Sequence, residues 1–167
     1  MAKSFKEVFP TLKLDSDISE LLNDAEVTKI SANHEHDHIR IYLCAKRLIF
    51  KKNIWKLENA IESQIFNGKN LKVTIIESYQ LSEQYTPRSL MDVYKDSILD
   101  EINRHSVLEY NLLRTAEMKF TDDYHMVMTL DETIIAKTRT NEIMEFLEKV
   151  VCERCGFDFH INVEYRQ

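Results

Sequence analysis

The sequence predicts an α+β protein built from two small units, each with the order α-β-β-α-β. Alternating apolar and polar residues predict strands, most clearly over residues 157–166, and apolar residues at three- and four-residue spacing predict the helices between them. The same order occurs twice, with LLNDAEV at Leu21 answered by LLRTAEM at Leu112. We therefore expect domains at 1–80 and 81–167, each packing its helices on a three-stranded sheet.

Composition indicates a folded chain outside the membrane. Hydrophobic residues make up 44% and charged residues 30% of 167 residues, with two Gly and two Pro, which is not typical of disorder. Neither a signal peptide nor a membrane span is expected. Three cysteines without an export signal favour reduced thiols and a cytoplasmic location. Residues 1–80 hold 12 basic and 11 acidic side chains, and residues 81–167 hold 10 and 17, so general polyanion binding is not expected.

The first unit begins with a stretch around Pro10 that favours an extended arm or a short edge strand. Asp15, Ser16 and Asp17 can cap a short helix that ends near Leu22. We then expect a hairpin with strands at 27–31 and 39–44, a helix within 46–66 and a strand at 71–79.

The second unit begins at a helix after the polar segment 82–86. Thr86 can cap this helix and Pro87 suits its first turn. Its buried face is predicted from Leu90, Val93, Tyr94, Ile98 and Ile102. The later elements are expected at 106–114 (helix), 117–121 and 124–130 (strands joined by a turn at Asp122-Asp123), 132–154 (helical) and 157–166 (strand).

Two patterns suggest metal or thiol chemistry but are better explained structurally. His34, His36 and His38 alternate like metal ligands, yet they fall in the predicted hairpin loop without partners at a diagnostic spacing. Cys152 and Cys155 form a lone CxxC near a helix end rather than at the N-terminus that would activate a thiol. We therefore expect no metal site, no cofactor and no catalytic residue in this chain. A small metalloenzyme built on the three histidines is kept as an alternative only because elemental analysis can readily exclude it.

A basic run around Trp55 is the best candidate for a functional surface. Cations interleaved with an aromatic side chain can bind phosphates and bases or an acidic partner, although such runs are also common on solvated helix faces. The run comprises Lys46, Arg47, Lys51, Lys52, Trp55 and Lys56.

Several segments together resemble the N-terminal region of PolC-type DNA polymerase III alpha subunits, the large replicative polymerases of Firmicutes. The resemblance rests on FPTLKLD, IRIYL, RLIFKKNIWKLE, LSEQYTP, DVYKDSILDEI, ERCGF and VEYRQ. It implies that OB-fold, exonuclease, PHP and polymerase parts follow in a longer protein. It also implies a first domain similar to the C-terminal domain of the clamp-loader tau subunit and a second similar to a type II KH domain.

A type II KH order requires the long helical region to break, and the run Thr138-Arg139-Thr140 makes a break near Lys137 to Thr140 plausible. KH domains that bind nucleic acid carry a GxxG loop at this place. Here the slot reads Ala136-Lys137-Thr138-Arg139, without glycine, although Lys137 and Arg139 can still reach phosphates.

The resemblance leads to a non-catalytic interaction module of a replicative DNA polymerase, docking on a replisome protein such as the clamp loader or helicase. The parent protein is expected to be a nucleotidyltransferase with 3′-5′ exonuclease activity. The alternative is a KH-like module that contacts template or primer DNA.

Overall fold

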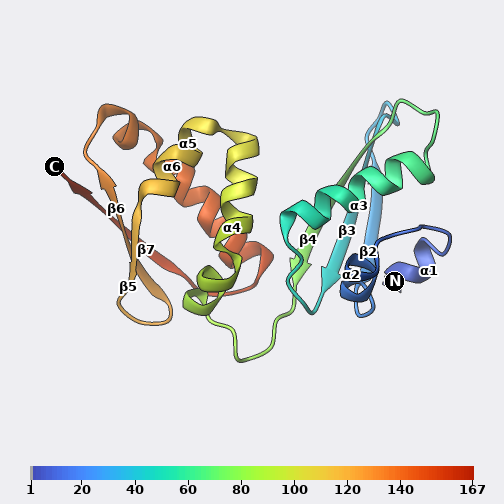
Figure 1. Cartoon of the computed structure of the whole chain (residues 1–167), viewed down its shortest axis with the longest axis horizontal. Helices are drawn as coiled ribbons and strands as arrows, with labels where there is room; N and C mark the ends of the chain where they lie inside the picture. The colour runs from blue at the N-terminus through green and yellow to red at the C-terminus, as the bar shows by residue number, and fades with distance from the viewer. Residues whose placement is uncertain (1) are drawn as a thin grey trace. The chain divides into compact units, whose positions relative to one another are not determined.

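The computed structural model describes residues 2–167 and divides the chain into two compact units, the first ending at Leu81 and the second beginning at Ser82. Figure 1 shows that each unit combines one small sheet with its own helices. The predicted α+β class is confirmed. Within residues 2–167, no helix has both the length and the apolar character needed to cross a membrane.

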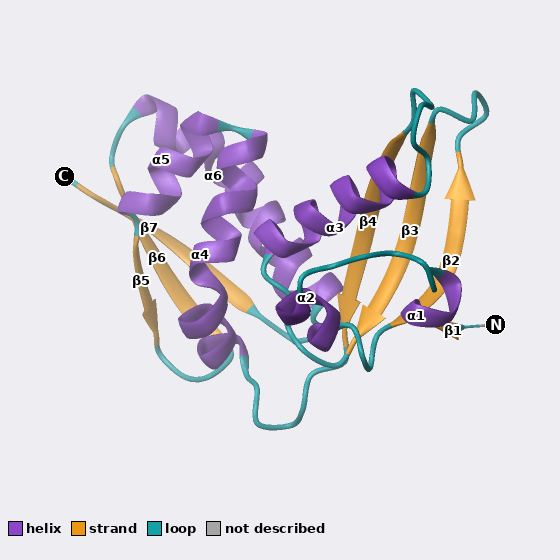
Figure 2. Cartoon of the chain, turned by 45° about the vertical axis from the view of Figure 1, so that its right-hand side comes forward, coloured by secondary structure: helices purple, strands orange, loops and turns teal. Residues whose placement is uncertain are grey.

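The first unit contains a four-stranded sheet in the order β1-β2-β3-β4. The pairs β1–β2 and β2–β3 are antiparallel, whereas β3 and β4 are parallel and are joined through α3, which covers one face of the sheet (Figure 2). In chain order the elements are β1 (Lys3–Ser4), α1 (Phe5–Val8), α2 (Ser16–Leu21), β2 (Glu26–Ala32), β3 (His38–Ala45), α3 (Lys51–Gln64) and β4 (Lys72–Tyr79).

The beginning of the chain differs from the expected arm. Only Lys3–Ser4 forms an edge strand, and a single helical turn follows because Ser4 Oγ accepts a hydrogen bond from the Glu7 N–H at 3.2 Å. The turn places the Phe5 ring, which is buried, 5.0 Å from the Phe9 ring. The burial of Phe5, the hydrogen bond of 2.9 Å from its N–H to the Ala25 carbonyl and the pairing of β1 with β2 hold the N-terminal segment on the body of the unit.

Helix α3 supplies most of the helical core of the first unit. Ile54, Leu57 and Ile61 are fully buried, and each buried aliphatic side chain contributes about 1.5–3 kcal/mol. The helix begins at Lys51 rather than near Lys46, since the preceding residues form the connection from β3. Ile65, which continues the helical spacing of these residues, lies at the C-cap and is 38% exposed.

The second unit contains a three-stranded sheet in the order β5-β6-β7. As in the first unit, the first pair of strands is antiparallel and the second pair is parallel. In chain order the elements are α4 (Pro87–His105), α5 (Val107–Thr115), β5 (Glu117–Phe120), β6 (His125–Asp131), α6 (Ile134–Glu148), the π-helix η1 (Lys149–Arg154) and β7 (His160–Arg166).

Helix α4 begins as predicted. Thr86 and Ser89 form a reciprocal capping box and Pro87 lies in the first turn. The buried face comprises Leu90, Tyr94, Ile98 and Ile102, but Val93 is 51% exposed and its predicted burial is wrong. Val93 lies next to Tyr94 at the margin of the apolar stripe, on the side that the core does not cover.

Helix α6 continues through Lys137 to Thr140 without the expected break. Thr133 caps it by accepting from the Ala136 N–H at 3.0 Å. The hydroxyls of Thr138 and Thr140 donate to the carbonyls four residues earlier, both at 2.7 Å, which accommodates these β-branched residues in the helix. The slot corresponding to GxxG is therefore helical, and the condition that the type II KH order required is not met there.

The predicted repeat is present in the backbone. The Ala25 N–H donates to the Leu22 carbonyl at 3.1 Å, and the Ala116 N–H donates to the Leu113 carbonyl at 3.2 Å. All four side chains are buried, and a strand begins at the residue after each alanine, β2 at Glu26 and β5 at Glu117. The two similar segments thus share this turn, although α5 extends to Thr115 whereas α2 already ends at Leu21.

Candidate partner-binding site

The predicted basic run is divided by the fold into one buried and several exposed residues. Lys51 is buried, and its Nζ lies 3.0 Å from both carboxylate oxygens of Glu77 on β4. This ion pair fixes the first turn of α3 on the sheet and offsets the unfavourable position of a cation at a helix N-terminus. The prediction that Lys51 is a binding residue is therefore corrected, because its ammonium is enclosed in the unit.

Lys46 and Arg47 lie exposed in the bend between β3 and α3. The Arg47 guanidinium is 3.5 Å from the Asp24 carboxylate, and both side chains are about half exposed. Such a surface ion pair contributes at most about 1 kcal/mol and leaves the guanidinium accessible to other anions.

Lys52, Trp55 and Lys56 lie on the outer side of α3. Both lysines are exposed and one helical turn apart, and Trp55 between them is half-buried. The fold thus keeps these three predicted residues together on one face of the first unit.

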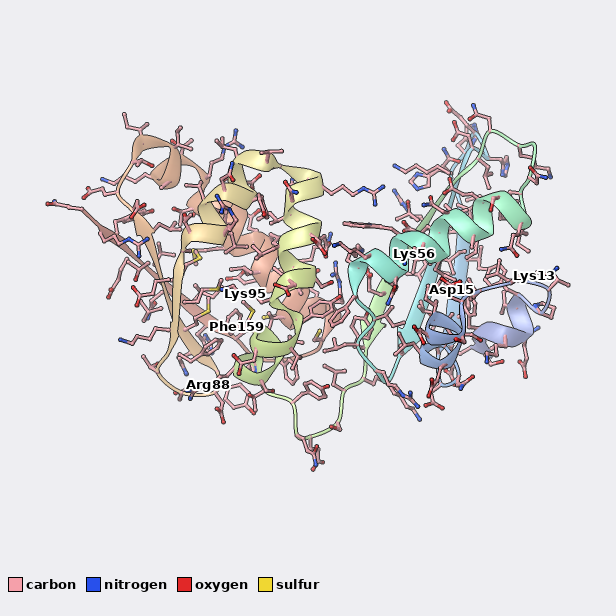
Figure 3. All side chains as sticks on the ribbon, in the orientation of Figure 1. Lys13, Asp15, Lys56, Arg88, Lys95 and Phe159 are labelled. Atoms are coloured by element: carbon pink, nitrogen blue, oxygen red, sulfur yellow. The ribbon has the colours of Figure 1, made fainter. Side chains whose placement is uncertain are left out.

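A shallow groove of about 340 Å³ extends this face between α3 and the segment that leads into α2. We call it the α2–α3 groove. Lys13 and Lys56 contribute exposed cations to it and Asp15 an exposed carboxylate (Figure 3). Asn59 and Ser63 contribute exposed polar groups. Its charge is positive because the two lysines outnumber the single carboxylate.

Gln64 fixes the geometry of this groove. Its side-chain oxygen accepts from the Lys13 N–H at 2.7 Å, and its side-chain amide donates to the Lys13 carbonyl at 2.8 Å. Both polar groups of the Lys13 backbone are therefore held against the end of α3. Sequence reasoning missed Lys13, Asp15 and Gln64, because no local pattern connects residues 51 positions apart.

Lys137 and Arg139 belong to the second unit and lie in the first turns of α6. The Lys137 Nζ lies 2.8 Å from Glu132 Oε1 and 5.8 Å from the centre of the Tyr165 ring. The hydrogen bond between the Lys137 ammonium and the Glu132 carboxylate raises the pKa of Lys137 and lowers the pKa of Glu132. Arg139 is half-buried, so neither cation stands free on a loop as a phosphate-binding residue of a GxxG site would.

The histidine-rich loop forms the β2–β3 turn. Asn33 Oδ1 accepts from the N–H groups of Asp37 and His38, both at 3.0 Å, and His38 Nε2 lies 2.7 Å from Thr74 Oγ1. Across residues 2–167, no three His, Cys, Asp or Glu side chains are grouped so as to hold a metal ion.

The CxxC cysteines lie at the end of η1. Cys152 is half-buried, Cys155 is buried, and neither of them is in a disulfide bond. Burial, followed by the nearby carboxylate of Glu148, raises the pKa of Cys152, which is the reverse of what an activated thiol needs. The arrangement agrees with the structural interpretation of this motif.

The comparison with known proteins concerns the first unit. Residues 4–75 match the family described as DNA polymerase III polC-type N-terminus I. The recognition of a PolC-type N-terminal region is confirmed over this stretch, which includes both strands of the first hairpin and the whole of α3. No curated protein matches the chain.

Proposed function

From the match of residues 4–75 to the N-terminus of PolC-type DNA polymerase III, we propose that this chain is a non-catalytic interaction module of a replicative DNA polymerase. The parent protein synthesises DNA with 3′-5′ proofreading, and the module docks it on another replisome protein. The docking surface is on the first unit, where the family match and the basic face coincide.

The α2–α3 groove is the observation that carries this proposal. Lys13 and Lys56 present cations from two elements held together by the paired hydrogen bonds of Gln64. A preformed groove avoids part of the ordering cost of binding. Lys52 and Trp55 extend the same face with a further cation and an aromatic side chain, a residue type enriched at protein interfaces.

The chemistry of the groove favours an acidic segment of the partner. The lysine ammonium groups attract carboxylates, and dissolved salt screens this attraction. The amide of Asn59 and the hydroxyl of Ser63 can form hydrogen bonds with an extended backbone. The two lysines therefore supply attraction and association rate, and the polar groups between them supply register.

The test is binding of the 167-residue chain to purified clamp loader and purified replicative helicase, measured by biolayer interferometry at several salt concentrations. We expect one of them to bind and the double variant Lys13→Glu/Lys56→Glu to weaken that binding about tenfold or more, because two attractions become repulsions. The double variant Lys95→Glu/Lys119→Glu is the matched control, since it makes the same charge change at two exposed lysines of the second unit. If neither protein binds, or if the double variant binds as the native chain does, the proposal is wrong.

Nucleic-acid binding is the second candidate, favoured by Lys52 and Lys56 one turn apart beside Trp55. Fluorescence anisotropy with labelled single-stranded and primer-template DNA tests it. Affinity that falls steeply with salt and is lost in Lys52→Glu/Lys56→Glu would support DNA as the ligand. No binding at low salt would exclude it and leave the protein partner.

A further inference from the structure

A groove in the second unit has the opposite character to the α2–α3 groove. It encloses about 320 Å³ between α4, α5 and the α6–η1 helical segment. We call it the Glu109 groove. It is lined by Glu101, His105, Glu109, Glu142, Glu145, Phe146 and Lys149.

Glu109 is the unusual residue of this groove. It is only 4% exposed, and none of the residues 2–167 forms a hydrogen bond or an ion pair with its carboxylate. Burial of a charge without a partner is costly, so such a group calls for an explanation. Among the described residues, every side-chain polar atom that is fully enclosed has a hydrogen-bond partner. The carboxylate oxygens of Glu109 have none, so they are not fully enclosed. We infer that their small exposed area faces the groove that Glu109 lines.

Helix capping does not account for this carboxylate. Ser106 and Glu109 have the spacing of a capping box, and Ser106 Oγ accepts from the Glu109 N–H at 3.2 Å. The reciprocal bond is not available, because the Ser106 N–H donates to the Ile102 carbonyl at 2.7 Å where α4 runs directly into α5. The positive end of α5 offsets part of the charge of Glu109, but its hydrogen-bonding capacity stays unused.

The neighbouring groups indicate which ligand would use it. Glu101 already binds the Arg154 guanidinium through two hydrogen bonds of 2.8 and 2.9 Å, so one wall of the groove is built around such a pair. Glu142 and Glu145 are exposed one turn apart on α6, with the half-buried Phe146 beside them. Because Glu101 is paired with Arg154, the negative charge of the lining that is left for a ligand belongs to Glu109, Glu142 and Glu145. The lining also contains the exposed side chains of His105 and Lys149.

We propose that the Glu109 groove binds an arginine side chain presented by an exposed segment of a partner protein. Glu109 accepts hydrogen bonds from the guanidinium, Glu142 and Glu145 add attraction, and the Phe146 ring packs against the planar group. Residues 81–167 hold 17 acidic and 10 basic side chains, and this net negative charge attracts a cationic ligand to the second unit.

The test uses the 167-residue chain and the capped peptide acetyl-Gly-Ala-Arg-Ala-Gly-amide, followed by amide NMR titration. We expect saturable shifts around Glu109, Glu142 and Phe146 at millimolar peptide. The same peptide with citrulline in place of arginine, which keeps the shape and removes the charge, should give none. Glu109→Gln should weaken arginine-peptide binding about tenfold, because it removes a charge-assisted hydrogen bond.

Glu148→Gln is the matched control, since it makes the same charge change on α6 outside the groove lining. The melting temperature of each variant checks its fold, and Glu142→Gln repeats the test at an exposed position should Glu109→Gln not fold. Equal binding of the citrulline peptide, unchanged binding by Glu109→Gln and Glu142→Gln, or shifts produced by magnesium chloride and not by the peptide would each overturn the proposal. None of these outcomes depends on the first unit, so docking through the α2–α3 groove is tested separately.

Discussion

The two units place different residues at one equivalent position of the same sheet. In the parallel pair of the first unit Glu77 lies opposite Leu43, and in the second unit Val163 lies opposite Met128. Each is two residues before the last sheet tyrosine, Tyr79 or Tyr165. The first unit therefore buries a carboxylate and its lysine partner where the second unit uses a valine. The topology does not need the ion pair, so we infer that Lys51–Glu77 sets where α3 begins rather than adding net stability.

A second difference concerns the last tyrosine of each parallel pair. The Tyr79 hydroxyl donates to the Ile49 carbonyl at 3.0 Å and accepts from the Ile49 N–H at 3.3 Å, so it holds the connection into α3. The Tyr165 hydroxyl lies 2.6 Å from Thr140 Oγ1 and thus contacts the body of α6. The first unit fixes a loop by these buried polar contacts, and that loop carries Lys46 and Arg47.

The largest effect is expected when the buried Lys51–Glu77 ion pair of the first unit is broken. Glu77→Ala leaves the buried Lys51 ammonium without its carboxylate, so we expect a loss of about 3–5 kcal/mol in the free energy of unfolding of the first unit. The loss is measured by urea unfolding followed through the fluorescence of Trp55, the one tryptophan of the chain.

The double variant Lys51→Met/Glu77→Val sharpens the same comparison by giving the first unit the apolar solution of the second. We expect it to restore a free energy of unfolding within about 1.5 kcal/mol of the native value, because both charges are removed together. A double variant as unstable as Glu77→Ala would show that the pair itself stabilises the unit, contrary to our inference.

A smaller effect is expected at the tyrosines. Tyr79→Phe leaves both backbone polar groups of buried Ile49 without their hydroxyl partner and should cost about 1–3 kcal/mol. Tyr165→Phe should cost about 1 kcal/mol or less, since the Thr140 hydroxyl still donates to the Ala136 carbonyl. Thermal unfolding of both variants measures the difference, and equal losses would contradict the distinct roles of the two hydroxyls.

The sequence allowed the regular elements and the repeat to be predicted because these depend on local chemistry. Thr86, Pro87 and Ser106 are capping or first-turn residues whose effect extends over one helical turn. The alternation of residues 157–166 predicted a strand with one buried face; β7 covers only His160–Arg166 of this stretch, and its residues alternate between exposed and half-buried.

Features that depend on distant residues were not predictable. Whether Lys51 or Lys52 is buried is decided by Glu77, 26 residues from Lys51. Two local features were missed as well: α6 runs unbroken through Thr138 and Thr140, whose hydroxyls donate to the carbonyls four residues earlier, and its end is the π-helix η1. Of the proposed binding face, Lys52, Trp55 and Lys56 were predicted as part of the basic run around Trp55, whereas Lys13 joined them only through the fold.

The smallest expected effect concerns the hairpin turns, which differ in charge. Asn33 Oδ1 accepts from two backbone N–H groups in the first unit, and Asp122 Oδ1 accepts from those of Tyr124 and His125 at 2.8 and 2.9 Å in the second. A further hydrogen bond from the His125 ring, at 2.9 Å, is the main cause that lowers the pKa of Asp122.

Because the pKa of Asp122 is lower in the folded state, the carboxylate contributes stability above the ordinary value of about pH 4, and this contribution is lost as pH falls through the folded pKa. Asn33 does not titrate, so the first hairpin has no matching dependence at that position. We expect an NMR titration of the Asp122 carboxyl to give a midpoint below the ordinary aspartate value and His125→Asn to move it upward. A midpoint that His125→Asn leaves unchanged would assign the shift to the backbone N–H groups alone, and the two turns would then differ only in the charge of one side chain.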